Sequence, residues 1–540
     1  MESVRVERLD HLGVLASVIK DLGLIEMINA RLVPDAQEVL TPGEAMAGMI
    51  LNGLGFAHRP LSSTAQFFAN TPLALLFRAG IRAEMLNRFK LGRTLDEAYT
   101  SGCDRWFHGL ALAVCAQEGL DLRCNHLDTT SFSLHGEYVP DSDEPAMTIT
   151  YGYSNDHRPD LKQAVLELLV SQDGGVPFGR TRWDGHTSDS KVFQARAQAL
   201  LAAFQKAPSP RYLIADSTLS HKDTAPHLHT LGFLTRIPHT LSAVSPVIAP
   251  ALAWDTWHRL DAETRDQCRE VCHDGMAQRW LIVQSDAALE RAEATLTKAR
   301  PREEATITQQ LFHRQAARFQ TPEVAQDALA ALAKRWTYHQ LASSTLSAHT
   351  RDVGKGRPTP HTPLQAIAWH IQARVRPDQE AMRYHQQVQA CCVLGTNISA
   401  SELSDAEVMA AYKGQSSVEG GFRLLKDPLF FVSSLFVKKP SRIEGRLMGM
   451  TLALVVDSVA QRRLRQPLAR HDETVPNHIN QPTMAPTWRW VFQLLEGIHC
   501  VRVTVQGQVH ERIEGLNDMK IKILRLFGER VCCLYQISPG

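Results

Sequence analysis

The sequence lacks an apolar run long enough to cross a membrane, and its N-terminus lacks the pattern of a secretory signal. The longest apolar stretch, Leu447–Val456, stops at Asp457, whereas a membrane span needs about 18 residues or more. The first ten residues, MESVRVERLD, are charged and contain no apolar core. We therefore expect a soluble protein that works in the cytoplasm and has no membrane partner.

The sequence also lacks an excess of charge of one sign and a cysteine pattern typical of a disulfide framework. The 58 basic residues nearly balance the 57 acidic ones, so that any site for a polyanion must come from local segregation of charge. Ten scattered cysteines in 540 residues are typical of reduced thiols in a cytosolic protein. No Gly-x-Ser-x-Gly or Gly-x4-Gly-Lys-Ser/Thr motif occurs, which argues against a serine hydrolase or an NTPase.

A chain of this length divides into several domains. The first part is rich in helix-forming segments, and one of them begins with a capping box at Thr41 and Glu44. Residues 286–336 are almost entirely helix-forming, and Gly354–Pro360 is typical of a linker. We predict a helical N-terminal domain, a core in two parts around a largely helical insertion domain, and a small α+β C-terminal module, with bounds 1–117, 118–240, 241–375, 376–465 and 466–540.

The pattern changes to strands after residue 120. Alternation and β-branched content predict four strands in sequence, with Gly174-Gly175 as the turn between the last two, then a helix near Ser190–Gln205. Two short apolar strands follow. A meander followed by alternating helices and strands is the order of an RNase H-like α/β fold. The expected strands are Leu122–Leu134, Thr148–Ser154, Val165–Ser171, Val176–Trp183, Tyr212–Ala215 and Phe233–Ile237.

Two aspartates lie in or directly after these strands. Asp128 is in the segment HLDTTSFSL, although Asp is disfavoured in strands, and Asp216 ends the strand YLIA. A local turn bond for Asp128 and a helix N-cap for Asp216 are the simple alternatives. Because ligand sites of open α/β sheets gather at the carboxyl ends of the strands, both aspartates are candidate site residues.

Glu419, in the segment AYKGQSSVEGGFRLLKDP, is the third acidic candidate. Ser416 and Glu419 match a capping box, which would give the carboxylate a structural role. On a continuous helix, however, polar and charged side chains four and seven positions away share the face of Glu419: Tyr412, Gln415, Arg423 and Lys426. The pair Gly420-Gly421 costs about 1 kcal/mol per glycine in a helix, which suggests that a substrate approaches closely there.

Carboxylates from these three positions at one sheet edge would supply hard oxygen ligands for two Mg²⁺ ions, for which Mn²⁺ substitutes. Two such ions about 4 Å apart activate water and stabilise the leaving oxygen in phosphodiester cleavage. The cationic residues on the Glu419 helix would then face phosphate.

With these residues in place, the sequence resembles the DDE transposases of bacterial insertion sequences. Tyr412, Gln415, Glu419 and Lys426 reproduce the spacing of the clan with a Tyr-Arg-Glu-Lys signature, and the layout is similar to the sixteen-thirty-four family. Gln415 departs from that signature, where Arg is expected, and Arg423 or Lys413 would have to supply the missing phosphate contact. Asp216 follows Asp128 by 88 residues and Glu419 follows Asp216 by 203, which leaves room for an insertion domain.

The resemblance implies that Asp128, Asp216 and Glu419 are catalytic and bind the ions. It implies that Tyr412, Gln415, Arg423 and Lys426 contact transposon-end DNA, and that the freed 3′ end is joined to target DNA by a homodimer in a synaptic complex. The helical N-terminal domain would bind DNA. A basic segment from residue 435 to residue 470 extends the expected DNA face through Lys438, Lys439, Arg442, Arg462 and Arg463.

Two other readings of the same residues stay open. An RNase H-like metal nuclease would cleave DNA without strand transfer, and a transposase-derived protein without activity would only bind DNA. The intact set of three carboxylates argues against the second of these.

Overall fold

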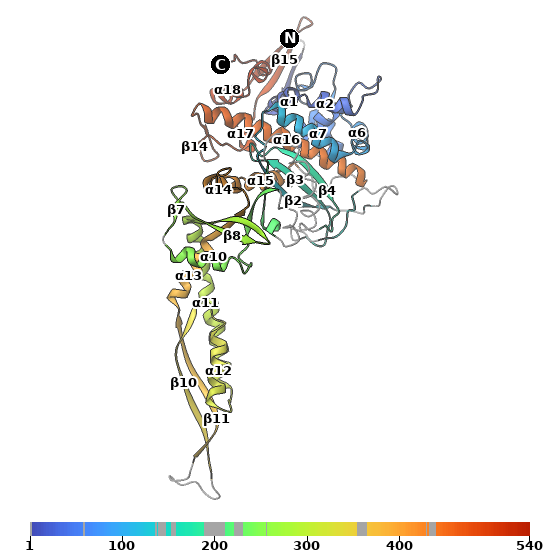
Figure 1. Ribbon diagram of the computed structural model, residues 1–540. Coiled ribbons are helices and arrows are strands. Elements are labelled where there is room, and N and C mark those ends of the chain that lie inside the picture. Colours follow the sequence, from blue (N-terminus) through green and yellow to red (C-terminus); the bar gives the residue numbers. More distant parts are fainter. Residues whose placement is uncertain are drawn as a thin grey trace. The chain divides into compact units, whose positions relative to one another are not determined.

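A computed structural model describes residues 3–539 apart from 58–59, 135–137, 139–146, 153–157, 188–210, 221–230, 255, 354–363, 428 and 431–438 (Figure 1). The expected helix near Ser190–Gln205, the linker Gly354–Pro360 and the candidate Lys438 lie outside the described residues. The chain forms two compact units. Residues 1–235 and 407–540 make up unit 1, and residues 236–406 make up unit 2.

The N-terminal part of unit 1 is a group of helices, as the sequence predicts. Helix α3 begins with the predicted capping box, in which Thr41 accepts from the Glu44 N–H and Glu44 accepts from the Thr41 N–H. Almost every residue of α3 is buried, because its neighbours cover it on all sides. The helices are α1 (Leu12–Asp21), α2 (Leu24–Arg31), α3 (Pro42–Leu54), α4 (Thr64–Phe68), α5 (Leu73–Leu76), α6 (Arg88–Thr100) and α7 (Cys103–Gln117), with 3₁₀ turns η1 (Leu61–Ser63) and η2 (Ala83–Met85).

The sheet of unit 1 has the strand order β4-β3-β2-β5-β6. β2, β3 and β4 form an antiparallel meander, and Gly174 and Gly175 turn the last hairpin with positive φ angles of 79° and 63°. β5 and β6 then run parallel to β2. Five of the six predicted strands are therefore confirmed, with bounds β2 (Cys124–Leu134), β3 (Lys162–Ser171), β4 (Pro177–Trp183), β5 (Tyr212–Ala215) and β6 (Gly232–Ile237). The prediction of a strand at Thr148–Ser154 is wrong for the described residues 148–152, which contain only an isolated bridge between Thr150 and Gln163.

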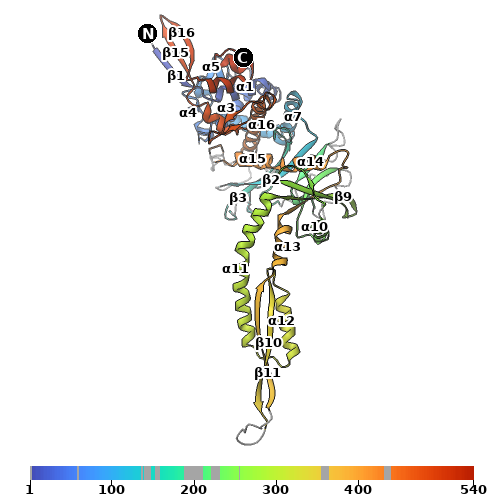
Figure 2. The same ribbon diagram turned by 90° about the vertical axis from the view of Figure 1, so that its left-hand side faces the viewer.

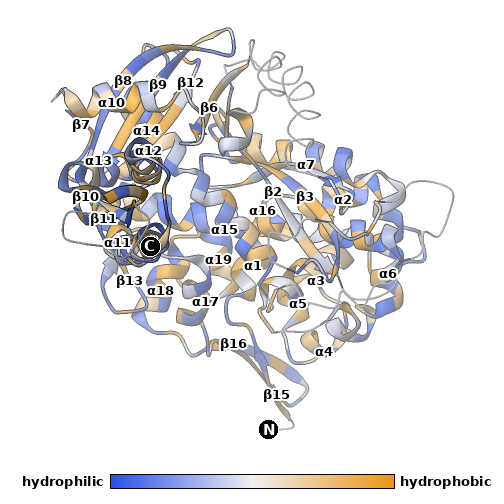
Figure 3. Ribbon diagram, turned by 90° about the horizontal axis from the view of Figure 1, so that it is seen from below, coloured by the Kyte–Doolittle hydropathy of each residue, from blue (hydrophilic) through white to orange (hydrophobic). Residues whose placement is uncertain are grey.

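Helix α16 (Pro440–Arg470) is a long helix of unit 1 and is buried over most of its length, and Figure 3 shows apolar residues along it. It packs against α1, α3, α6 and α7 and against β4. Two shorter helices, α14 (Asp405–Lys413) and α15 (Gln415–Leu425), precede it, and α15 lies against both β2 and α16. None of the helices in the described part of the chain is long and apolar enough to span a bilayer.

The C-terminal part contains both short strands and helices. It runs β13 (Val475–Pro476), β14 (Pro482–Thr483), α17 (Trp488–Leu494), β15 (His499–Val505), β16 (Gln508–Glu514), α18 (Asp518–Arg525) and α19 (Glu529–Leu534). The N-terminal strand β1 (Ser3–Arg8) pairs antiparallel with β15, from Ser3 opposite Thr504 to Arg8 opposite His499. The two ends of the chain thus share one three-stranded sheet, a pairing over nearly the whole chain length that local patterns cannot reveal.

Unit 2 is not largely helical, and that expectation is wrong. It contains an antiparallel sheet of β12 (Cys391–Thr396), β9 (Met276–Ser285), β8 (Thr264–His273) and β7 (His258–Arg259). Helix α10 (Ser245–Ala253) packs on this sheet through a core that includes Ile248, Trp280 and Val393. The strands β7, β8 and β9 were missed because their mixed polar and apolar residues have no strict alternation.

A long two-stranded ribbon, β10 (His339–Asp352) and β11 (Leu364–Pro377), also belongs to unit 2 (Figure 2). The helices α11 (Asp286–Ala316) and α12 (Pro322–Ala333) pack on it, which confirms the helix-forming reading of this region. A further helix, α13 (Gln379–Ala390), connects the ribbon to β12. The predicted linker Gly354–Pro360 therefore falls between the two ribbon strands rather than between domains.

Candidate functional site

Asp128 lies in β2, and Asp216 directly follows the neighbouring parallel strand β5. β2 and β5 pair with His126 opposite Ile214, an offset of 88 residues, and Asp216 follows Asp128 by the same 88. The register continued by two residues therefore places the two aspartates opposite each other, on strands whose usual spacing is about 4.8 Å. Asp216 is the residue directly after β5, at its carboxyl end.

The environments of the two aspartates differ. Asp128 is half-buried within β2, and its Oδ1 accepts from the backbone N–H of Thr129 at 2.8 Å. Asp216 is exposed and precedes the 3₁₀ turn η3 (Ser217–Ser220), and its carbonyl oxygen accepts from the hydroxyl of Thr235 on β6. A hydrogen bond from a side chain of the neighbouring strand thus fixes the end of β5 at the exposed Asp216.

Glu419 lies on α15, and its carboxylate is exposed. The capping-box alternative is not realised, because α15 begins at Gln415, one residue before Ser416. The Ser416 hydroxyl donates instead to the Lys413 carbonyl at 2.9 Å, as a residue inside a helix does. The predicted continuous helix is also interrupted, since α14 ends at Lys413 and α15 starts after Gly414.

A buried hydrogen-bond network connects α15 to β2. The imidazole Nδ1 of His126 lies 3.1 Å from Oε1 of Gln415, and its Nε2 is hydrogen-bonded to Oε1 of Gln172. The amide nitrogen of Gln172 donates to the Ala410 carbonyl of α14 at 3.2 Å. Burial lowers the pKa of His126, although its hydrogen bonds to Gln172 and Gln415 act in the opposite direction.

This network orients the candidate carboxylates relative to the sheet. Side chains two apart on a strand share a face, so Asp128 lies on the same face of β2 as His126, the face that α15 covers. Gln415 and Glu419 are four apart and share one side of α15. Sequence reasoning missed His126 and Gln172. Their only local signal is a polar residue two positions before Asp128 and another directly after a buried strand.

The donor chemistry of the two aspartates suits a hard divalent ion, since carboxylate oxygens are the ligands that Mg²⁺ prefers. In the part of the chain that the structure describes, however, no cluster of three or more His, Cys, Asp or Glu residues is close enough to hold a metal ion. The fold therefore brings Asp128 and Asp216 together, and it carries Glu419 on the adjoining helix without adding it to the pair.

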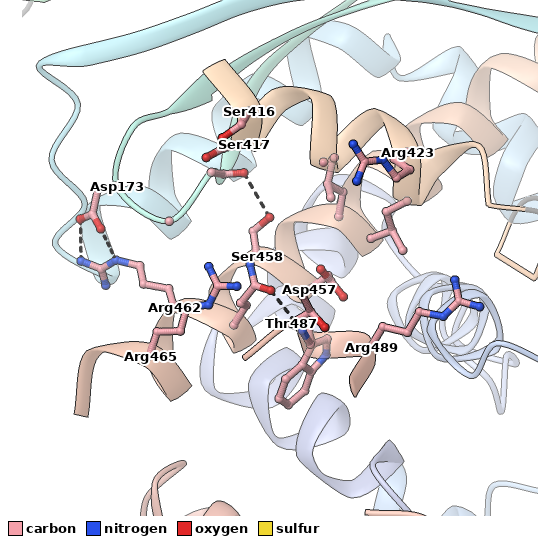
Figure 4. Close-up of a pocket in the computed structure, with 18 of the residues that line it drawn as sticks. Asp173, Ser416, Ser417, Arg423, Asp457, Ser458, Arg462, Arg465, Thr487 and Arg489 are labelled. Carbon is pink, nitrogen blue, oxygen red and sulfur yellow. Dashed lines mark hydrogen bonds and ion pairs between the residues drawn. The ribbon is translucent and has the colours of Figure 1, made fainter. Parts of the chain in front are cut away.

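A cavity of about 780 Å³ borders α15 within unit 1 (Figure 4). Ser416, Ser417, Gly420, Gly421 and Arg423 of α15 form one wall. A Cβ atom added to Gly420 would meet nothing within 4 Å, so no packing within the described structure requires a glycine there. The remaining walls come from the β3–β4 turn, α16 and the segment 487–489, and they include the charged residues Asp173, Asp427, Asp457, Arg462, Arg465 and Arg489.

Most of the cationic groups in this cavity already have partners. Arg462 forms two bonds to Asp173, at 2.7 and 2.8 Å, and Arg489 pairs with Asp427. Arg465 donates to the Pro486 carbonyl at 3.0 Å. Within the described residues, the exposed Arg423 has no ion pair, which leaves its guanidinium available to a ligand. Figure 4 shows Arg423 across the cavity from the Asp173–Arg462 pair.

The other predicted DNA contacts fall into two groups. Lys426, directly after α15, and Tyr412 on α14 are half-buried, and Lys439 is exposed. Gln415 is only 8% exposed and is bonded to His126, so its amide does not face solvent.

The basic residues of α16 do not form the open face that we expected. Arg442 makes two bonds to Asp96 at 2.6 and 2.7 Å. Arg463 bonds to Asp21 at 2.9 Å and to Glu118 at 2.6 Å. The side chain of Arg462, paired with Asp173, is only 9% exposed. These arginines tie α16 to the surrounding helices and to the β3–β4 turn. The pairing could not be predicted from local sequence, because the partners lie far away along the chain.

Asp457 is an acidic group of α16 inside the cavity. Burial raises its pKa to about 7, although the positive charge of Arg465 acts in the opposite direction. A second acidic group of the same helix, Glu444, also has its pKa raised to about 7 by burial, against the lowering effect of Arg182 at 2.6 Å. The interior of unit 1 around α16 therefore holds carboxyl groups that titrate near neutral pH.

Comparison with known proteins assigns the family. Residues 126–456 match the model of the transposase DDE domain, and residues 4–112 match a domain of unknown function (DUF4277). No curated relative matches the chain. A solved piggyBac transposase synaptic complex with hairpin DNA is similar at 10% identity and a TM-score of 0.32, over 90% of this chain and 79% of that one, which is too distant to transfer anything to this protein. The match to the transposase DDE domain covers more than half of the residues of this chain. The chain therefore belongs to the family defined by that domain.

Proposed function

We propose that the protein is a transposase of a bacterial insertion sequence that cleaves DNA at transposon ends and joins the freed 3′ end to target DNA. The observation that carries the proposal is the common level of Asp128 and Asp216 on the parallel strands β2 and β5, within the segment that matches the transposase DDE domain. The strand order β4-β3-β2-β5-β6, a meander followed by parallel strands, supports an RNase H-like catalytic core.

Asp128, Asp216 and Glu419 are the groups that we propose as metal ligands. When bound to these carboxylates, two Mg²⁺ or Mn²⁺ ions would supply an activated water and charge stabilisation for phosphodiester cleavage. Glu419 has to join the two aspartates for this, and the helix that carries it is held to β2 by the bond between His126 and Gln415. We therefore assign His126 and Gln415 a positioning role for α15.

The DNA strand that enters the site would pass over Gly420 and Gly421, where the helix presents backbone without side chains to the cavity. Arg423 on the same wall would contact a phosphate. Lys426, Tyr412 and Lys439 complete the proposed contacts. Gln415 is not among them, because its amide is bonded to His126. Arg442, Arg462 and Arg463 are not among them either, because their guanidiniums are bonded to carboxylates.

We propose that the chain acts as a dimer in the synaptic complex, because each of the two transposon ends needs one active site. The DNA on which it acts would be the bacterial chromosome or plasmids in the cytoplasm. The alternatives are a nuclease without strand transfer and a DNA-binding protein without activity. The common register of Asp128 and Asp216 favours an enzyme over the inactive protein, since binding alone does not require two carboxylates side by side.

The test uses the purified chain and labelled duplexes that carry the DNA flanking its reading frame, with a supercoiled plasmid as the target. With Mg²⁺ present, we expect cleavage at the ends of the element and labelled joint molecules with the plasmid. Cleaved ends without joint molecules would identify a nuclease. Binding without cleavage in either Mg²⁺ or Mn²⁺ would identify the inactive protein.

A further inference from the structure

The ribbon of β10 and β11 in unit 2 has two unlike faces. One face packs on α11 and α12 through a core that contains Ile307, Leu311, Leu329 and Ile371. Leu341, Leu346, Ala373 and Val375 of the ribbon pack against that core as well. Because side chains alternate across a strand, the residues between them lie on the opposite face, away from the helices.

That opposite face is polar and basic. It consists of cross-strand pairs in which the residues of β10 carry amide or hydroxyl groups and those of β11 carry guanidinium or amide groups: Gln340 with Arg376, Ser343 with Arg374, and Thr345 with Gln372. Gln340 is half-exposed and the other five are exposed. The only acidic residue of the two strands is Asp352, at the far end of β10.

Arg374 and Arg376 of β11 carry the positive charge of these cross-strand pairs. No ion pair of either guanidinium is found among the residues that the structure describes, in contrast to Arg442, Arg462 and Arg463 of unit 1. The chain as a whole has a net charge of only +1. The ribbon is thus a place where positive charge is locally segregated and left open to a ligand.

We propose that this ribbon face binds duplex DNA. A two-stranded ribbon fits the major groove, which is about 12 Å wide. The pairs from Gln340 to Ser347 extend over roughly 24 Å at the rise of a β-strand. Guanidinium, amide and hydroxyl groups are those that contact phosphates and base edges. A second copy of the chain fits less well, because a symmetric contact would bring Arg374 and Arg376 against their own copies.

The inference rests on the proposed function only in that the protein acts on DNA, and it adds a binding surface in unit 2, outside the candidate site. The test measures fluorescence anisotropy of a labelled 40-bp duplex of mixed sequence, titrated with the full chain in EDTA at several KCl concentrations. The double variant Arg374→Ala, Arg376→Ala should bind about tenfold or more weakly at 150 mM KCl. The slope of log K against log[KCl] should fall in magnitude by about 2, since each lost phosphate contact removes about 0.9.

The matched control is Lys298→Ala, Arg300→Ala, which removes the same charge from exposed positions of α11. We expect its affinity and salt slope to equal those of the wild type. Equal slopes for the wild type and the ribbon variant would overturn the inference while cleavage by the wild type stood. A dimer of the wild type that becomes a monomer in the ribbon variant, with unchanged DNA affinity, would overturn it in favour of a contact between copies. A wild type that binds no DNA would overturn both this inference and the proposed function.

Discussion

His126 and Gln415 are hydrogen-bonded at 3.1 Å, although 289 residues separate them in the sequence. His126 lies two residues before Asp128 on β2, and Gln415 lies four residues before Glu419 on α15. One buried bond therefore couples the strand of the first candidate carboxylate to the helix of the third. The spacing matches a signature in which Arg is expected at position 415, and the structure shows what the glutamine does in its place.

Gln415→Leu should weaken this coupling. The substitution leaves a buried imidazole nitrogen without its partner, which costs about 1–3 kcal/mol. We expect a lower free energy of unfolding in urea, together with a fall in the cleavage rate at unchanged DNA affinity. Ser416→Ala, at the neighbouring exposed position, is the control for the unfolding measurement and should have the midpoint of the wild type. An unfolding midpoint of Gln415→Leu equal to that of the control would show that the bond does not hold α15 in place.

Lys426→Ala tests a phosphate contact on the same segment. A hydrogen bond to a charged group is worth about 1.5–3 kcal/mol, so single-turnover cleavage should fall by roughly one to two orders of magnitude without disappearing. Arg423→Ala should have an effect of the same order, because its guanidinium lies on the cavity wall. Complete loss of cleavage in a folded Lys426→Ala protein would place the ammonium group in the chemical step, and wild-type cleavage would exclude the contact.

Arg462→Ala should affect stability rather than DNA binding. Arg462 and Asp173 form a bidentate pair, with side-chain exposures of 9% and 27%, and removal of one partner leaves the other charge partly buried. After allowance for this partial exposure, we expect a loss of about 2 kcal/mol in urea unfolding. The exposed Arg470→Ala is the control. A large loss of DNA affinity at unchanged stability would restore Arg462 to the DNA face.

Asp457 should make the stability of the protein depend on pH. Burial raises its pKa to about 7 in the folded protein, above the usual value near 3.8 that it takes in the unfolded chain. The folded state therefore binds this proton more strongly, so the contribution of Asp457 to stability is greatest at low pH and is lost as the pH rises through the interval from about 4 to about 7. Asp457→Asn carries no titrating carboxyl group, and its melting temperature should exceed that of the wild type by a margin that grows from pH 5 to pH 8. Parallel curves of melting temperature against pH would contradict the raised pKa.

Much of the sheet in unit 1 could be predicted because its strands are short, apolar and bounded by turn residues such as Gly174 and Gly175. The separation of 88 residues between Asp128 and Asp216 could be counted from the sequence. Only the observed pairing of β2 with β5 shows that paired residues of the two strands are also 88 residues apart. The ribbon could not be predicted, because the exposed half of β10 has no apolar alternation. The ion pairs of α16 were hidden for a related reason, since the carboxylate that binds Arg442 lies 346 residues earlier.

The most direct test of the central claim is metal-dependent cleavage by three isosteric variants, Asp128→Asn, Asp216→Asn and Glu419→Gln. Each removes one negative charge and nearly preserves shape. Duplexes that carry the flanking DNA of the reading frame are cut in Mg²⁺ and in Mn²⁺, and binding is measured in EDTA with the same duplexes. We expect every variant to bind DNA as the wild type does and to lose cleavage in Mg²⁺, with partial recovery in Mn²⁺ because that ion tolerates altered ligands. Cleavage by Glu419→Gln at the wild-type rate would contradict the three-carboxylate site and the transposase mechanism that depends on it.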